Sequence, residues 1–221
     1  VVFPIQMMKV LGIDNLLVDL EKSLMGVHYL GELSPRSKDR IVSFGERLSS
    51  LILSKTINSQ GISSEKIDAF SLITTDNTFG EASVFFEESY RKISRAILPL
   101  LKDDIIPVIT GFIAKSIDGD ITTLGRGGSD YTASIVGAGI EADEIWIMTD
   151  VDGIMTTNPK ICSSAYTIPE LSYLEAMELA YFGAKVLHPR TIEPAISKSI
   201  PVRVKNSTSE SPGTLILKDT N

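Results

Sequence analysis

The sequence predicts an α/β fold with a mostly parallel sheet. Strand-like apolar segments alternate along the chain with segments whose apolar residues recur at helical spacing, which is the pattern of layered α/β proteins. Several strand candidates are continuous apolar runs, as expected for strands that are covered on both faces. No linker rich in proline, glycine or serine and no internal repeat divides the chain, so we expect one domain over residues 1–221.

The strand candidates are short runs of branched and aromatic residues. They are residues 70–74, 105–110, 144–149, 201–205 and 214–217. Two more runs, 113–117 and 121–124, flank Asp118-Gly119-Asp120, and the tolerance of glycine for positive φ predicts a hairpin there. Trp146 is interpreted as a core residue and Cys162 as a loop residue.

Apolar side chains at steps of three and four residues predict three helices, each with one buried face. The three stripes are Ile41, Phe44, Leu48 and Leu51, then Phe86, Tyr90, Ile93, Ile97 and Leu100, and last Leu171, Leu174, Met177, Tyr181 and Ala184. Thr78, with Glu81 three residues later, predicts a capping box before the second of these helices.

Composition excludes several classes of function. Lys+Arg at 21 against Asp+Glu at 28 gives 21 − 28 = −7, which argues against a nucleic-acid or anionic-membrane surface. One cysteine and 2 histidines provide neither a disulfide framework nor a Cys/His zinc cluster, which fits a reducing, cytoplasmic compartment. The apolar opening stretch is interrupted and well short of the roughly 20 residues that a membrane span needs.

The most informative stretch is Thr-Leu-Gly-Arg-Gly-Gly-Ser-Asp-Tyr at residues 123–131, between the hairpin and a helix of small residues. Its glycines let the backbone approach a ligand, and the free N–H groups of the following helix favour an anion. Arg126 adds a planar fork suited to a carboxylate or phosphate. The alternative is that Ser129 or Asp130 only caps the helix. That reading stays open for Ser129, but a cap does not require an arginine between glycines.

Two later segments carry weaker signals. Thr149, Asp150 and Asp152 follow a buried strand, and ligands of open α/β sheets bind beyond the carboxyl ends of strands. Lys185 and His188 fall at the end of the third predicted helix. His188 is interpreted as structural, and Lys185 is left undecided, because a lysine there is often only a partner of the helix dipole.

These segments together resemble the aspartokinase family of the amino-acid-kinase superfamily. The matching strings stand in the family's order and cover nearly the whole chain. They are Ser-Phe-Gly-Glu-Arg-Leu-Ser at 43–49, Thr-Gly-Phe-Ile at 110–113, Thr-Thr-Leu-Gly-Arg-Gly-Gly-Ser-Asp-Tyr-Thr-Ala at 122–133, Thr-Asp-Val-Asp-Gly-Ile at 149–154, Phe-Gly-Ala-Lys-Val-Leu-His-Pro at 182–189, Val-Lys-Asn at 204–206 and Pro-Gly-Thr at 212–214. The resemblance implies a three-layer αβα sandwich, the amino-acid-kinase (carbamate-kinase-like) fold.

The resemblance also implies a reaction, the ATP-dependent phosphorylation of the side-chain carboxylate of L-aspartate to 4-phospho-L-aspartate. This is the first step toward lysine, threonine and methionine. By position, Arg126 binds the carboxylate of the substrate, Glu46 contacts its amino group, and Asp130 orients the catalytic lysine. Gly127, Gly128 and Ser129 complete the implied substrate site. The alternative for Glu46 is a solvated partner of Arg47.

For ATP, the resemblance implies six positions, which are Thr149, Asp150, Met155, Lys160, Lys185 and Val186. Mg²⁺ is expected to bridge the phosphates and to stay largely hydrated, with no metal cage built by the protein. Family members commonly self-associate, so a homodimer is expected.

The chain also departs from the family pattern. The opening Lys-Phe-Gly-Gly-Thr-Ser string, which supplies a catalytic lysine, does not occur, and regulatory ACT domains do not follow. The expectation is therefore a catalytic domain that is truncated at its N-terminus. Met155 replaces a common aromatic residue, and Lys160 a common arginine. Two alternatives remain, another acyl-acceptor kinase of the superfamily and a non-catalytic regulatory relative that binds nucleotide and aspartate.

Overall fold

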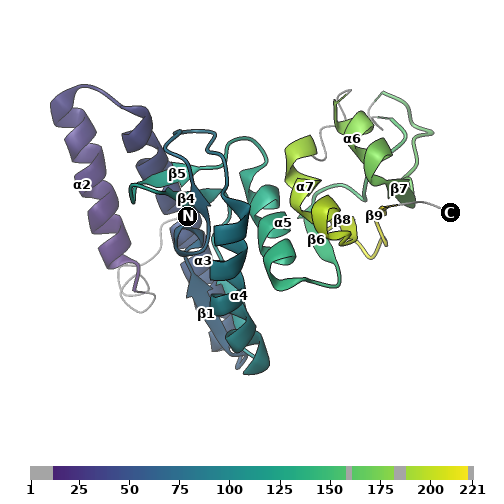
Figure 1. Ribbon diagram of the computed structural model, residues 1–221, viewed down its shortest axis with the longest axis horizontal. Helices are drawn as coiled ribbons and strands as arrows, with labels where there is room; N and C mark the ends of the chain where they lie inside the picture. The colour runs from purple at the N-terminus through teal and green to yellow at the C-terminus, as the bar shows by residue number, and fades with distance from the viewer. Residues whose placement is uncertain (1–11, 158–160, 182–187, 219–221) are drawn as a thin grey trace. The chain divides into compact units, whose positions relative to one another are not determined.

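The computed structural model describes residues 12–157, 161–181 and 188–218. The chain divides into two compact units, Val1–Ser129 and Asp130–Asn221 (Figure 1). Among the described residues the strands form three sheets, in which four of the six strand pairings are parallel. The predicted α/β class with mostly parallel pairing is therefore confirmed, and the single catalytic domain expected over residues 1–221 stays a prediction.

The first unit contains three described helices and two small sheets. The helices are α2 (Asp14–Leu30), α3 (Pro35–Ser59) and α4 (Phe86–Lys102). One sheet pairs β1 (Ser64–Ile67) with β3 (Ile106–Ile109) in parallel. The other consists of β2 (Thr74–Thr75), β4 (Ile113–Ser116) and β5 (Ile121–Thr123), and its β4–β5 pair is the predicted hairpin.

Helix α3 carries Glu46, the first of the predicted site residues along the chain. The side chain of Ser34 caps its start by accepting a hydrogen bond from the Ser37 N–H at 3.1 Å, and Pro35 fits the first turn, where its missing N–H costs nothing. Its apolar stripe is anchored by Phe44, which is fully buried. The stripe of α4 is likewise confirmed, because Ile93 and Ile97 are buried.

Two local predictions in this unit are wrong. Residues 70–73 do not form a strand, and β2 begins only at Thr74, because η1 (Ala69–Ser71) is a 3₁₀ turn in which the Ser71 N–H and hydroxyl both donate to the carbonyl of Asp68. Thr78 does not cap α4. Its N–H and hydroxyl bond the carboxylate of Asp76 instead, and α4 begins only at Phe86. In both places a local side-chain bond competes successfully with the predicted element.

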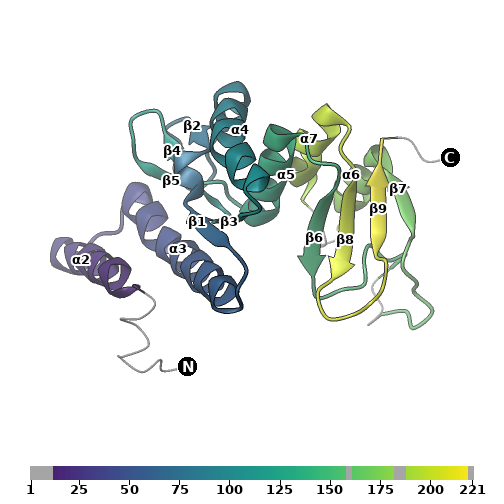
Figure 2. The same ribbon diagram turned by 90° about the horizontal axis from the view of Figure 1, so that it is seen from below.

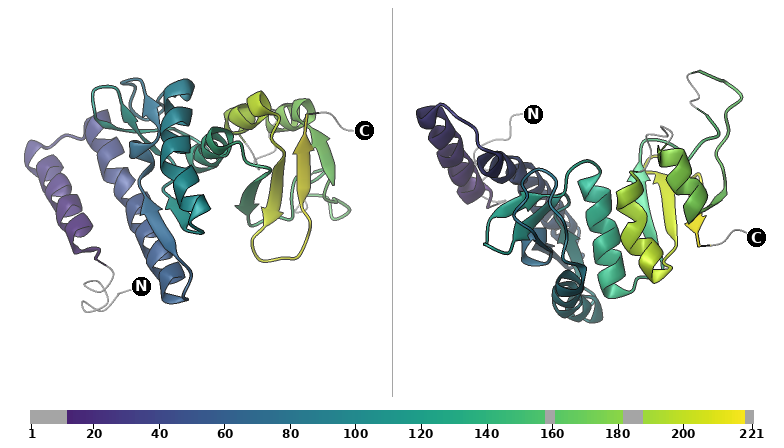
Figure 3. Two further views of the ribbon diagram at one scale, coloured as in Figure 1. Left: turned by 60° about the horizontal axis from the view of Figure 1, so that its bottom comes forward. Right: turned by 45° about the horizontal axis from the view of Figure 1, so that its top comes forward.

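The second unit is a four-stranded sheet with helices. Helix α5 (Gly128–Ile140) begins with the last two residues of the first unit, and its remaining residues belong to the second. Its strands follow the order β6 (Ile145–Thr149), β8 (Val202–Asn206), β9 (Thr214–Leu217) and β7 (Glu170–Ser172), as Figure 2 shows. Helices α6 (Tyr173–Tyr181) and α7 (Pro189–Lys198) lie next to each other on one face of this sheet (Figure 3).

Successive side chains of β6 point alternately to a covered face and to an exposed face of the sheet. Ile145 and Ile147 of β6 are buried, whereas Trp146 between them is 55% exposed. The Nζ of Lys205, on the neighbouring strand β8, lies 4.8 Å from the centre of the indole ring. The prediction that Trp146 is a core residue is therefore wrong, because the two-residue period of a strand places it opposite its buried neighbours.

The third predicted stripe is also wrong. Leu171 belongs to β7, and the helix starts only at Tyr173. Tyr173 and Ala176 are its buried residues, whereas Leu174 is 68% and Tyr181 80% exposed. Ala184 lies outside the described residues. The apolar spacing identified residues that lie on one face of the helix, but the helix packs against the protein through a different face.

Candidate functional site

The glycine-rich turn leads from β5 into α5. Gly125 and Gly127 have φ of +78° and +69°, in the left-handed region that other residues rarely adopt. The following helix begins at Gly128, so its first backbone N–H groups have no partner within the helix. Arg126 is exposed, and in the described part of the chain its guanidinium has no ion-pair partner. An exposed guanidinium of this kind has the donor geometry that suits a carboxylate or phosphate.

Glu46 of α3 faces the loop that follows β3. Its side chain is half-buried, and this burial raises the pKa of its carboxyl above the ordinary value. A backbone hydrogen bond from Gly111 lowers the pKa and offsets part of that rise. The alternative that Glu46 is a solvated partner of Arg47 is not what the described residues show, because Arg47 pairs with Asp68 instead.

The same loop packs against the start of α5 through two glycines. A Cβ on Gly111 would lie 2.8 Å from both Cβ and Oγ of Ser129, and a Cβ on Gly128 would lie 2.7 Å from Cδ2 of Phe112. Such distances leave no room for a side chain at either glycine. The phenylalanine also has a φ of +67°, a strained value that is more common at functional sites.

Three segments that are distant in the sequence therefore meet in the first unit. Glu46 of α3 contacts Gly111, and Gly111 packs against Ser129 of the glycine-rich turn. The structure brings these predicted substrate residues together. It adds Phe112, to which sequence reasoning gave no role. The signal was present, because residues 110–113 form one of the matching strings.

A second residue that the sequence analysis missed is Asp39, also on α3. It is only 2% exposed, and its carboxylate accepts hydrogen bonds from the N–H groups of Gly80 at 2.8 Å and Thr123 at 2.9 Å. The hydroxyl of Thr123 donates a third, at 3.1 Å. The carboxylate thus fixes the end of β5, three residues before Arg126. No signal in the sequence distinguishes it from an ordinary solvated charge on a helix.

The second unit contains the predicted catalytic aspartate and the predicted nucleotide residues. Asp130 lies in the first turn of α5, and burial raises the pKa of its carboxyl. Thr149 ends β6, and its carbonyl accepts hydrogen bonds from the N–H and the hydroxyl of Ser207 at 2.9 and 3.0 Å. Its hydroxyl donates to the exposed Asp150 at 3.2 Å. Met155 is half-buried in a loop.

Three predicted nucleotide residues, Lys160, Lys185 and Val186, lie outside the described residues. His188, just beyond the last of them, caps α7, where its Nδ1 accepts from the Arg190 N–H at 3.4 Å. This contact supports the structural interpretation of that histidine.

Asp152 has a different role from its neighbour Asp150. One of its oxygens, Oδ1, accepts from the amide of Asn206 at 2.9 Å and from the hydroxyl of Ser209 at 2.6 Å. These bonds hold the pKa of the carboxyl below its ordinary range. The side chain therefore connects the loop after β6 to the last residue of β8 and to the loop that follows β8.

No helix in the described ranges is long and apolar enough to cross a membrane. No group of three or more His, Cys, Asp or Glu side chains among these residues could hold a metal ion.

Residues 10–206 match the model of the amino acid kinase family, and the chain belongs to this family. Its relatives include aspartokinases. It is 42% identical over 225 residues to aspartokinase 1, chloroplastic, of Arabidopsis thaliana. This alignment covers 97% of this chain and 39% of the relative. To lysine-sensitive aspartokinase 3 of Escherichia coli it is 36% identical over 208 residues, 91% of this chain and 46% of the relative. The resemblance to aspartokinases is therefore confirmed.

Solved structures agree with this assignment. A crystal structure of E. coli aspartokinase III in complex with aspartate and ADP superposes with a TM-score of 0.89 at 35% identity, covering 95% of this chain and 46% of that one. UMP kinase from Bacillus anthracis, at 17% identity and a TM-score of 0.59, shares the fold alone. The predicted amino-acid-kinase fold is confirmed. The chain spans less than half the length of these aspartokinase relatives.

Proposed function

We propose that this chain is the catalytic part of an aspartate kinase, which transfers a phosphoryl group from ATP to the side-chain carboxylate of L-aspartate. The observation that carries the proposal is the meeting of Glu46, Gly111 and Ser129 in the first unit. The similarity to aspartokinases over 91–97% of the chain supports it.

The proposed substrate has a charged group for each part of this site. A half-buried carboxylate such as Glu46 suits an ammonium group. The exposed fork of Arg126 suits an α-carboxylate, and so does the N-terminal end of α5, which begins at Gly128. Phosphoryl transfer depends on positioning and charge stabilisation more than on covalent chemistry. Asp130 is proposed to orient the lysine that stabilises the transferring group.

The nucleotide is assigned to the second unit. Thr149, Asp150 and Met155 are the described residues of this proposed site, and Lys160, Lys185 and Val186 are proposed from the resemblance alone. Mg²⁺ is proposed to bind the phosphates of ATP and to neutralise their charge. A homodimer and a cytoplasmic location belong to the proposal too, the second supported by the single cysteine of the chain.

The proposal is tested by supplying ATP, Mg²⁺ and one acceptor at a time to the protein. ADP release and trapping of the acyl phosphate as a hydroxamate are measured together. L-Aspartate is expected to support both signals. Succinate, which lacks the ammonium group, and N-acetyl-L-glutamate, in which it is blocked, are expected to support neither.

Two other results would point to the alternatives. Turnover with N-acetyl-L-glutamate in place of aspartate would identify another acyl-acceptor kinase. Binding of ATP and aspartate without ADP release would identify a non-catalytic regulatory relative.

A further inference from the structure

Arg47 follows Glu46 on α3, but its side chain is directed into the protein. It is 17% exposed, and the central carbon of its guanidinium lies 5.0 Å from the ring centre of Phe44 and 5.6 Å from that of Phe70. A cation at such distances over aromatic faces is attracted to them. The rings come from α3 and from η1, so this arginine spans two elements of the first unit.

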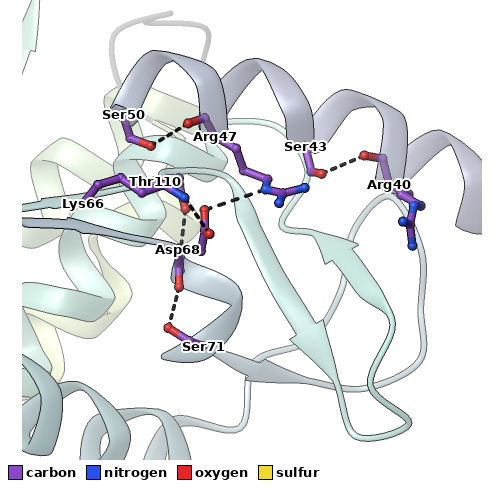
Figure 4. Close-up of polar contacts among 9 residues, drawn as sticks. Arg40, Ser43, Arg47, Ser50, Lys66, Asp68, Ser71 and Thr110 are labelled. Atoms are coloured by element: carbon purple, nitrogen blue, oxygen red, sulfur yellow. Dashed lines mark hydrogen bonds and ion pairs between the residues drawn. The ribbon is translucent and has the colours of Figure 1, made fainter. Parts of the chain in front are cut away.

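The guanidinium shares one carboxylate with a lysine. Figure 4 shows Arg47 of α3 and Lys66 of β1 converging on Asp68. The Nε of the arginine lies 3.9 Å from Oδ1 of Asp68, and the Nζ of the lysine lies 2.6 Å from Oδ2. The Nε and Oδ1 atoms are buried and have no hydrogen-bond partner among the described residues. Their attraction is therefore weakly screened by solvent.

Asp68 is tied through its backbone neighbours to the loop that contacts Glu46. The N–H of Ala69 donates to the hydroxyl of Thr110 at 2.8 Å, and the Thr110 N–H donates to the carbonyl of Ile67 at 3.1 Å. The next residue, Gly111, makes the backbone hydrogen bond to Glu46. The contacts thus close a ring from Arg47 through Asp68, the loop and Glu46 back to α3.

We propose that Arg47 is a positioning residue for the substrate site. Together with Asp68 it forms the Arg47–Asp68 clamp, which holds the Glu46 carboxylate at a fixed place against the 110–112 loop and so sets how the ammonium group of the amino acid is held. This inference rests on the proposed function. A purely structural arginine would affect stability and would weaken the binding of both substrates alike.

The variant Arg47→Met tests the clamp. Methionine keeps an apolar stem near the two rings, and Lys66 still neutralises Asp68, so the protein is expected to fold. The KM for aspartate is expected to rise about tenfold and the KM for ATP to change less than about twofold, as for the loss of one charged contact. Arg47→Lys, which restores a cation, is expected to recover part of the loss.

Arg40→Met is the matched control. Arg40 lies seven residues earlier on the same helix, is exposed, and stands apart from the Asp68 cluster in Figure 4. Its kinetic constants are expected to equal those of the unmodified protein. The proposal is overturned if Arg47→Met raises both KM values by the same factor or matches this control. Should Arg47→Met fail to fold, Asp68→Asn is used, with the same expected split.

A second measurement keeps this proposal separate from the proposed function. Hydrogen–deuterium exchange of a peptide over residues 109–113 is compared between the unmodified protein, Arg47→Met and Arg40→Met, with residues 145–149 as the internal reference. Faster exchange at 109–113 only in Arg47→Met supports the clamp, and unchanged exchange overturns it. If the unmodified protein shows no aspartate-dependent turnover, the proposed function fails, and exchange alone decides on the clamp.

Discussion

The residues assigned to the amino acid and those assigned to the nucleotide are held in different ways. In the first unit, Glu46 is tied to Gly111, and the chain that leads to Arg126 is fixed by the buried carboxylate of Asp39. In the second unit, Thr149 and Asp150 stand at the end of β6, and exposed side-chain hydrogen bonds link this strand end and the loop after it to the end of β8 and the residue that follows. The first region is anchored in the interior, and the second is fastened at the surface.

Under the proposed function, this difference separates two recognition problems. A small amino acid offers few atoms, so the groups that recognise it must be fixed before it binds. A nucleotide is larger and offers phosphates that loop residues and a metal ion can share. Three measurements test this contrast between the two regions.

The largest effect is expected from Asp39→Ala. The N–H groups of Gly80 and Thr123, of which the second is buried, lose their acceptor, and the loss is expected to lower the free energy of unfolding by about 3 kcal/mol. Urea unfolding followed by far-UV circular dichroism measures this. The counterpart in the second unit, Asp152→Ala, removes a surface fastening and is expected to leave the unfolding midpoint nearly unchanged. Equal losses in the two variants would remove the contrast between the regions.

The next effect is on substrate binding. Arg126→Ala is expected to raise the KM for aspartate roughly 30-fold, because a charge-assisted contact of about 2 kcal/mol is lost. The KM for ATP is expected to change less than about twofold. Arg95→Ala, an exposed arginine on α4, is the control. An equal rise in both KM values would show that Arg126 is misassigned.

The smallest effect is a pH dependence. Burial raises the pKa of the Glu46 carboxyl, so acidification protonates it at a higher pH than an exposed glutamate. The kcat/KM for aspartate is therefore expected to fall as the pH is lowered through that raised pKa. A raised carboxyl pKa favours the folded state at low pH and loses that contribution as the pH rises through the raised value, so this group does not cause unfolding in acid. Glu46→Gln is expected to lack the acid limb. The same limb in this variant would assign it to another group, such as Asp130.

The sequence correctly predicted those elements for which the local sequence pattern and the packing in the folded protein favour the same structure. The hairpin around Gly119 and the helices carrying Phe44 and Ile93 form as expected, because turn chemistry and apolar spacing indicate the same structure there. It also predicted Glu46 and Ser129 as parts of one site, and the structure links them through Gly111.

The remaining errors have a physical cause, which is that local pattern does not specify what covers a face. Leu174 and Tyr181 share a helical face, yet the helix packs through Tyr173. From the sequence alone Asp39 is indistinguishable from a surface charge, because the end of β5 that it bonds is distant in the chain. The clamp formed by Arg47 and Asp68 likewise depends on residues that only folding brings together. Long-range contacts of this kind have no signature in a single sequence.

The position of Trp146 has a practical consequence. It is the one indole of the chain, and it lies 55% exposed on β6, two residues after Glu144 and three before Thr149. Intrinsic fluorescence excited selectively in the indole therefore reports on the second unit alone. Emission and ellipticity recorded on the same denaturation series would coincide if the whole chain melts as one cooperative body. They would separate if its two halves come apart in sequence.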